Sequence, residues 1–393
     1  MLRIGLVGSG FLAGIRARCY AQVGGRKGTL VAIASRDAAR AADFAASAEI
    51  ETVFSDFPAM LASPEIDVVD LCVPNHLHRT MTEAAAAAGK HIICTKPLAA
   101  YIGQDLAEDA STAGQQSRKK MLAVATADAQ AMVAAAEQAD VRLCYAENWI
   151  YAPAFQRAAA LAKTSGGRLL EMRGWESHSG SHSPYAKQWG HTGGGALLRL
   201  GAHPIGAMLR LKYDEGLALD GTPVVPVSVL ADVADLTRTR GLTAEQTRIA
   251  TGWEDVENWG CCMIEFSDGA RGVAYGSDNC LGGMQSRLEL SGSNFHTAVQ
   301  MSPNDLLRSY TPDADVYGDT YIMEKADTSA GWTTPMPDEM WTSGHASMLE
   351  AFLDDITAGR DPLADGALGL AVTEVVYAAY LAAENGQRVT LPR

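Results

Sequence analysis

The chain lacks an excess of basic residues. Its 393 residues include 32 Lys and Arg against 46 Asp and Glu, a formal net charge of −14. A nucleic-acid-binding protein needs a basic surface to meet phosphates, so the charge argues against that class. We also see no apolar run that approaches the length of a membrane span, and expect no secretory leader before the first strand.

Cysteine is scarce and unpatterned. There are seven cysteines, no C-x-x-C pair, and one adjacent pair at Cys261 and Cys262. This does not resemble a disulfide framework, so a reducing cytoplasm is the expected compartment. The apolar fraction of 47% and the charged fraction of 20% are ordinary for a globular protein, and the length is sufficient for two domains.

Short apolar runs alternate with helical patterns in the first third of the chain. Strands are expected at residues 3–7, 30–34, 68–73 and 91–94, and helices at 11–23, 37–48 and 80–88. This alternation predicts an α/β fold with an N-terminal doubly wound parallel sheet of the Rossmann type.

The first strand runs into the sequence GSGFLA, a G-x-G-x-x-A motif. Gly8 permits a tight turn, Gly10 permits close approach of a pyrophosphate, and Ala13 lets the helix pack close to the strand. With Phe11 and Leu12 in the same turn, the motif predicts a dinucleotide site at the helix N-terminus.

Cofactor preference is expected at the end of the second strand, where a carboxylate would favour NAD. Here Ser35 and Arg36 follow the strand, with Asp37 one step later. Ser35 and Arg36 suit a 2′-phosphate, which favours NADP over NAD as the cofactor. The alternative is that Arg36 is a solvated residue at the start of a helix.

Five separated stretches then resemble the Gfo/Idh/MocA oxidoreductases, the family of glucose-fructose oxidoreductase and inositol dehydrogenase. They are GLVGSGFLA, DVVDLCVPNHLH, GKHIICTKPLA, GGGALLRLGAHPIG and the segment from GRDPLADG to RVTLP. Their order and spacing cover nearly the whole chain.

The resemblance implies a nucleotide-binding domain over residues 1–146, with an insertion near 101–120. It implies an α+β domain over residues 147–393 with a large open, mostly antiparallel sheet. It also implies hydride transfer on a sugar, glycoside, cyclitol or sugar acid, and a homodimer or homotetramer. One alternative is a non-catalytic sensor, which would bind the cofactor but would not oxidise or reduce any substrate. A nicotinamide-dependent glycoside hydrolase, which oxidises a sugar transiently, is a further alternative.

The family's E-K-P motif is carried here by Thr95, Lys96 and Pro97. The resemblance assigns Lys96 to the catalytic site and to the cofactor contacts, where it would stabilise a developing alkoxide. The usual glutamate is missing. The segment also implies contacts from Pro74, Asn75 and His78 to the nicotinamide half, although a histidine there is more often a loop or capping residue than a catalyst.

The second catalytic segment departs from the family pattern, in which an Asp precedes a His by four positions. His203 holds the histidine position and is expected to be the general base. Arg199 holds the Asp position and cannot act as a base. It is expected either to lower the pKa of His203 or Lys96, or to bind a substrate anion. The alternative is a structural salt bridge.

Substrate contacts are expected from a segment of polar groups between aromatics and from one histidine of a Gly/Ser-rich loop. These residues are Glu147, Asn148, Trp149, Tyr151, His182 and again Arg199. His178, His182 and His191 lie close together in sequence, but no cysteine or paired carboxylate completes a metal site, so no metal is expected. The insertion at 101–120 is expected to be a lid or, alternatively, an oligomer contact.

Overall fold

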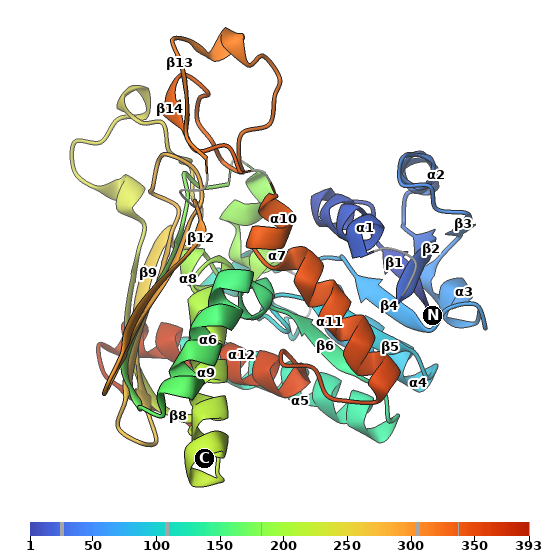
Figure 1. The fold of residues 1–393 in the computed structure, drawn as a ribbon, viewed down its shortest axis with the longest axis horizontal. Coiled ribbons are helices and arrows are strands. Elements are labelled where there is room, and N and C mark those ends of the chain that lie inside the picture. The colour runs from blue at the N-terminus through green and yellow to red at the C-terminus, as the bar shows by residue number, and fades with distance from the viewer. Residues whose placement is uncertain (24–26, 107–109, 182, 304–306, 337, 393) are drawn as a thin grey trace.

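The computed structural model describes residues 1–23, 27–106, 110–181, 183–303, 307–336 and 338–392. Two sheets organise the chain (Figure 1). The first is a six-stranded parallel sheet in the order β3-β2-β1-β4-β5-β6, which confirms the predicted doubly wound fold. Its strands are β1 (Leu2–Val7), β2 (Gly28–Ala34), β3 (Thr52–Phe54), β4 (Val68–Leu71), β5 (His91–Thr95) and β6 (Leu143–Ala146).

The helices of this part follow the expected alternation. They are α1 (Phe11–Val23), α2 (Ala38–Ser47), α3 (Phe57–Leu61), α4 (His78–Ala87) and α5 (Arg118–Gln138). The sequence pattern missed β3, α3 and β6, which are too short to show a period. It also extended the third strand to residue 73, whereas β4 ends at Leu71.

The second sheet has seven strands in the order β12-β11-β7-β10-β9-β8-β15, antiparallel except where β7 meets β10. This confirms the predicted large, mostly antiparallel sheet. The strands are β7 (Leu169–Ser177), β8 (Pro226–Ala234), β9 (Trp259–Phe266), β10 (Arg271–Ser277), β11 (Gln285–Gly292), β12 (His296–Ser302) and β15 (Val389–Thr390). A small hairpin of β13 (Ser309–Thr311) and β14 (Gly331–Thr333) projects away from both sheets (Figure 1).

One face of the second sheet is covered by helices. α9 packs on β7 and β10, α12 on β8, and α6 on β12. The helices of this part are α6 (Pro153–Ser165), α7 (Trp189–Thr192), α8 (Ala196–Arg199), α9 (Ala202–Asp220), α10 (Glu339–Thr342), α11 (His345–Ala358) and α12 (Gly366–Asn385).

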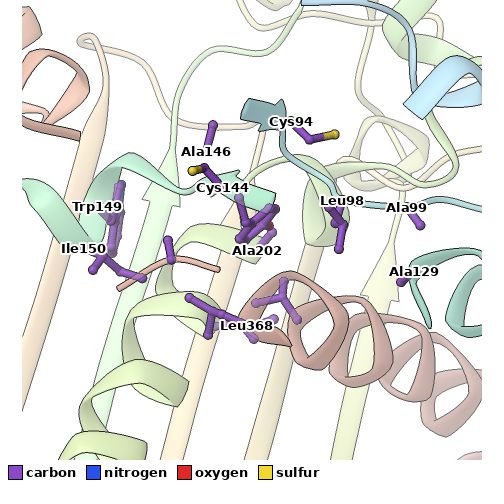
Figure 2. Close-up of a cluster of buried hydrophobic side chains, with 14 of the residues drawn as sticks. Cys94, Leu98, Ala99, Ala129, Cys144, Ala146, Trp149, Ile150, Ala202 and Leu368 are labelled. Atoms are coloured by element: carbon purple, nitrogen blue, oxygen red, sulfur yellow. The ribbon is translucent and has the colours of Figure 1, made fainter. Parts of the chain in front are cut away.

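The last two helices return to the first sheet's layer, because α11 packs against α1 and α12 against α5. The hydrophobic core is therefore continuous between the two sheets. Figure 2 shows Cys94 and Cys144, from β5 and β6, in one cluster with Ala202 of α9 and Leu368 of α12. This shared core holds the ends of β5 and β6 against α9, where the candidate site lies.

α12 corrects one expectation from the sequence. Within the part of the chain that the structure describes, it is the one helix long and apolar enough to cross a membrane, with a mean hydropathy of 1.5. Yet 67% of its most apolar stretch is buried inside the protein. Burial of this kind is typical of the core helix of a globular protein.

The seven cysteines are all free, so the structure contains no disulfide bond among them.

Candidate active site

A glycine-rich turn joins β1 to α1 at the carboxyl end of the parallel sheet. Gly8 has a φ of +104°, and a Cβ there would collide with the carbonyl oxygen of Cys72. A Cβ on Gly10 would meet no atom within 4 Å, so the space beside its backbone is open. Phe11 is 74% exposed, whereas Ala13 is fully buried. The turn therefore fits a dinucleotide whose pyrophosphate lies against Gly10 and the helix N-terminus.

The end of β2 lies next to this turn. The Ser35 hydroxyl is 3.1 Å from the hydroxyl of Ser9. Asp37 caps α2, because its carboxylate accepts the N–H of Arg40 at 3.0 Å. Arg36 is exposed. The first carboxylate after β2 is thus engaged in a helix cap, while the Arg36 guanidinium is available to an anionic ligand.

A cavity of about 420 Å³ lies between the two sheets, bounded by the turn and by the second sheet. Phe11 and Leu12 line it from α1, and Lys96 lines it from the end of β5. His203 and Glu176 line it from α9 and β7. A larger cavity of about 570 Å³ lies between α6 and α9, but it is lined mainly by alanine and leucine. The smaller cavity is therefore the candidate active site.

Lys96 lies immediately after β5, and its Nζ donates a hydrogen bond to the backbone carbonyl of Arg199. Burial lowers the pKa of Lys96, the Glu147 carboxylate opposes this, and the Arg199 guanidinium lowers the pKa further. The expected influence of Arg199 on Lys96 is therefore present, but it is secondary to burial. A lysine whose ammonium form is disfavoured is suited to exchange or share a proton with a bound ligand.

His203 lies in the first turn of α9 and is held from behind. Its Nδ1 is 2.7 Å from Oε1 of Glu147, and its ring stacks on Trp149 with centroids 6.0 Å apart and planes 14° apart. Nε2 has no hydrogen-bond partner within the described chain. The carboxylate thus orients the ring and leaves its second nitrogen for a ligand.

Arg199 is paired rather than free. Its guanidinium forms an ion pair with the fully buried Asp278 and lies 5.4 Å from the ring centroid of Trp253. His178 lies on the other side of Asp278, with 3.6 Å between its Nδ1 and Asp278 Oδ1. Burial, and then Arg199, lowers the pKa of His178 to about 3, so this histidine is neutral. The structural salt bridge considered from the sequence is present, and Arg199 still lines the cavity.

Three residues that were expected to contact a ligand are buried and do not line the cavity. Glu147 is fully buried behind His203. Tyr151 is core: its hydroxyl accepts the N–H of Ala364 and its ring packs against Phe352. His78 is also fully buried, with its ring nitrogens within 3.2 Å of three backbone carbonyls, so it fastens a loop instead of meeting a cofactor. In each case the sequence shows the residue type but not the direction of the side chain.

Of the remaining residues that were expected to contact a ligand, some line the cavity and others do not. Asn148 and Trp149 line the cavity. Asn75 lies after β4, where its side-chain amide donates to the carbonyl of Thr192 at 2.8 Å, and Pro74 before it is half-buried. His182 lies outside the described residues. Among those described, no group of three or more His, Cys, Asp or Glu could hold a metal ion.

The insertion near 101–120 does not line the cavity in its described part. Arg118, Lys119 and Lys120 belong to the first turn of α5 instead of a loop. Tyr101 is buried, and its carbonyl accepts the indole N–H of Trp189 at 3.0 Å. Arg118 lies 4.0 Å from the Trp189 ring centroid. These contacts fasten the insertion to α7.

Six ionisable residues that line the cavity were not singled out in the sequence. They are Arg16 of α1, Glu176 of β7, Glu324 and Lys325 between β13 and β14, Glu339 of α10 and His345 at the start of α11. The inward alternation along β7 was the one signal that could have indicated Glu176. Glu324 and Lys325 lie in an irregular segment, which carries no periodic signal.

The fold and the site together define a dinucleotide-binding oxidoreductase. Residues 2–126 match the family model described as an oxidoreductase family with an NAD-binding Rossmann fold. Residues 155–295 match the model of the GFO/IDH/MocA C-terminal domain. The chain belongs to the GFO/IDH/MocA oxidoreductase family, and is a nicotinamide-dependent oxidoreductase.

Individual relatives share part of its sequence. A levoglucosan dehydrogenase of Pseudarthrobacter phenanthrenivorans is 29% identical over 296 residues, 72% of this chain and 68% of the relative. A D-apiose dehydrogenase of Paraburkholderia graminis is 30% identical over 186 residues, 46% of this chain and 42% of the relative. The crystal structure of GenD2 from gentamicin A biosynthesis, in complex with NAD, covers 100% of this chain and 97% of that one, with a TM-score of 0.79 and 25% identity.

Proposed function

We propose that this protein transfers a hydride between a nicotinamide dinucleotide and a hydroxyl or keto group of a sugar, glycoside, cyclitol or sugar acid. The observation that carries the proposal is the convergence of Lys96 and His203, whose ring Glu147 holds from behind, on one cavity beside the glycine-rich turn. Relatives that oxidise levoglucosan and D-apiose support the substrate class.

The site residues divide the work on the substrate oxygen. When bound, the nicotinamide supplies the hydride acceptor or donor. Lys96 lines the cavity and stabilises the negative charge that develops on the reacting oxygen. His203 takes the hydroxyl proton at Nε2, because Glu147 holds Nδ1. Arg199 is paired with Asp278 and therefore does not present a free charge to the substrate.

The cofactor preference follows from the end of β2. Asp37 caps α2 and is therefore not directed at a ribose hydroxyl, while Arg36 is exposed. We infer that NADP is accepted at least as well as NAD, with Arg36 meeting the 2′-phosphate.

Self-association is proposed through the uncovered face of the second sheet. Leu230 and Met263 are direct neighbours across β8 and β9, and Tyr275 lies on the next strand, all more than a third exposed. Such an apolar sheet face is suited to pairing with a second copy. Met263→Glu is expected to shift the molar mass in light scattering to that of a monomer. A wild-type protein that is already monomeric would contradict the proposal.

The first experiment tests the reaction. Purified protein is incubated with NAD or NADP and a panel of sugars, glycosides, cyclitols and sugar acids, and nicotinamide reduction is recorded. Lys96→Ala is expected to lose at least about 10²-fold in kcat. The matched control is Lys119→Ala, which removes an exposed lysine of α5 that has no contact with the cavity. Failure of the wild type on the whole panel would contradict the proposal.

A further inference from the structure

Glu176 is a buried carboxylate in the wall of the cavity. It belongs to β7, where its cross-strand neighbour on β11 is Ser286, and it is 3% exposed. Both residues line the cavity. β7 is an interior strand of the second sheet, so the backbone that carries Glu176 is held by hydrogen bonds on both sides.

The carboxylate of Glu176 is only partly satisfied. Its side chain hydrogen-bonds to Ser286, but Oε2 has no donor among the described residues. Glu147 and Asp278 also leave one buried carboxylate oxygen without a donor, but neither lines the cavity, and their other oxygens hold His203 and Arg199. A buried carboxylate oxygen without a donor is costly, which makes a ligand or a transferred proton the natural partner.

Oxidation of an alcohol also requires a place for the hydroxyl proton. The family position for an acidic residue holds Arg199 here, which cannot accept one. Glu147 is fully enclosed behind His203 and does not line the cavity, so a proton placed on it has no route out. Glu176 lines the same cavity as His203 and is ionisable.

We propose that Glu176 is the carboxylate that receives the substrate's hydroxyl proton, through His203, and so replaces the acidic residue missing at position 199. This inference rests on the proposed oxidoreductase function and extends it by naming the proton acceptor.

The substrate O–H bond breaks as the proton passes to Nε2 of His203, and the C–H electron pair leaves as a hydride to the oxidised nicotinamide while C=O forms. The His203 N–H bond then breaks and an O–H bond forms on Glu176, leaving a neutral carboxylic acid. In the reduction direction Glu176 returns the proton by the same path.

The surroundings of Glu176 poise it for both directions. Burial raises its pKa to about 7. His203 of α9, the hydrogen bond from Ser286 and Lys96, which follows β5, act to lower the pKa. The Glu147 carboxylate acts to raise it. A group that is half ionised near neutral pH can both accept and return a proton.

The test compares wild type, Glu176→Gln and Glu176→Asp, with Glu171→Gln as the matched control. Glu171 lies on the same strand, and its side chain is 41% exposed and paired with Arg173. Each protein is assayed from about pH 5 to about pH 9 with a substrate found in the panel. We expect wild-type oxidation to rise with pH through about 7, and Glu176→Gln to lose this limb and about 10²-fold in kcat, with KM little changed. Glu176→Asp is expected to recover part of the limb. An unchanged pH limb in Glu176→Gln would overturn the inference.

A second readout does not depend on turnover. Infrared difference spectra of wild type against Glu176→Gln are expected to show a carboxylic-acid C=O band that disappears as pH rises through about 7. Absence of that band overturns the inference even in an active enzyme. If the wild type is inactive on the whole panel, the oxidoreductase proposal fails on that result alone, and the infrared band still decides whether Glu176 holds a proton near neutral pH.

Discussion

Oε1 of Glu147 lies 2.7 Å from Nδ1 of His203, and the two residues are 56 positions apart in the chain. Glu147 follows directly after β6, a strand of the first sheet, and His203 lies in the first turn of α9, which covers the second sheet. The hydrogen bond therefore ties the end of the first sheet to the helices that cover the second. It determines which ring nitrogen of His203 faces the cavity.

Replacing Glu147 by Gln should preserve packing but remove the charge that orients His203. We expect kcat to fall by about 10²- to 10⁴-fold with little change in KM, because the enclosed side chain does not contact a substrate. Steady-state kinetics with a saturating cofactor measures this, and circular dichroism checks the fold. An increase in KM without loss of kcat would show instead that Glu147 binds substrate.

Removing one partner of the buried Arg199–Asp278 pair should be costly. Arg199→Met leaves Asp278 buried and uncompensated, so we expect a loss of about 3–5 kcal/mol in the free energy of unfolding. The double variant Arg199→Met with Asp278→Asn should lose less than the sum of the single variants. Urea denaturation of the four proteins measures the coupling, and additive losses would show that the pair does not interact.

Arg36 should determine the discrimination between NADP and NAD. Arg36→Gln is expected to raise KM for NADP by about tenfold or more and to leave KM for NAD almost unchanged, because only NADP carries the 2′-phosphate. Arg40→Gln is the matched control, since Arg40 is also exposed and lies in the first turn of α2. Equal effects on both cofactors, or none, would contradict the assignment.

Glu176 should make the protein less stable as pH rises. Its pKa is about 7 in the folded protein, against an ordinary value of 4.5 for a glutamate, so between these two pH values the folded state holds the proton while the unfolded state has lost it. Stability therefore falls between about pH 4.5 and pH 7, by an amount on the order of 3 kcal/mol. Glu176→Gln should melt at a higher temperature than wild type at pH 8 and close to it at pH 4. A melting temperature difference that does not change with pH would argue against a raised pKa.

Features that depend on residues close together in the chain were predicted correctly more often than features that depend on residues far apart in the chain. The turn after β1 was predicted correctly, because its glycines act on neighbouring backbone atoms. β3 and β6 were missed, because three or four residues carry too little pattern. Tyr151 and Glu147 were read as substrate contacts, since an aromatic and a carboxylate in a loop do not reveal which way they point.

By itself, the sequence determined the alternation that builds the parallel sheet, the glycine turn and the place of Lys96 at the end of a buried strand. These depend on residues close together in the chain, whose backbone conformations and periodicity are local properties. Only the tertiary structure decided that His203 is held by Glu147, that Arg199 pairs with Asp278, and that Glu176 faces the cavity. Those relationships join residues far apart in the chain. The packing of α9 against residues 148–151 and β7, and of α8 against β10, brings them within reach.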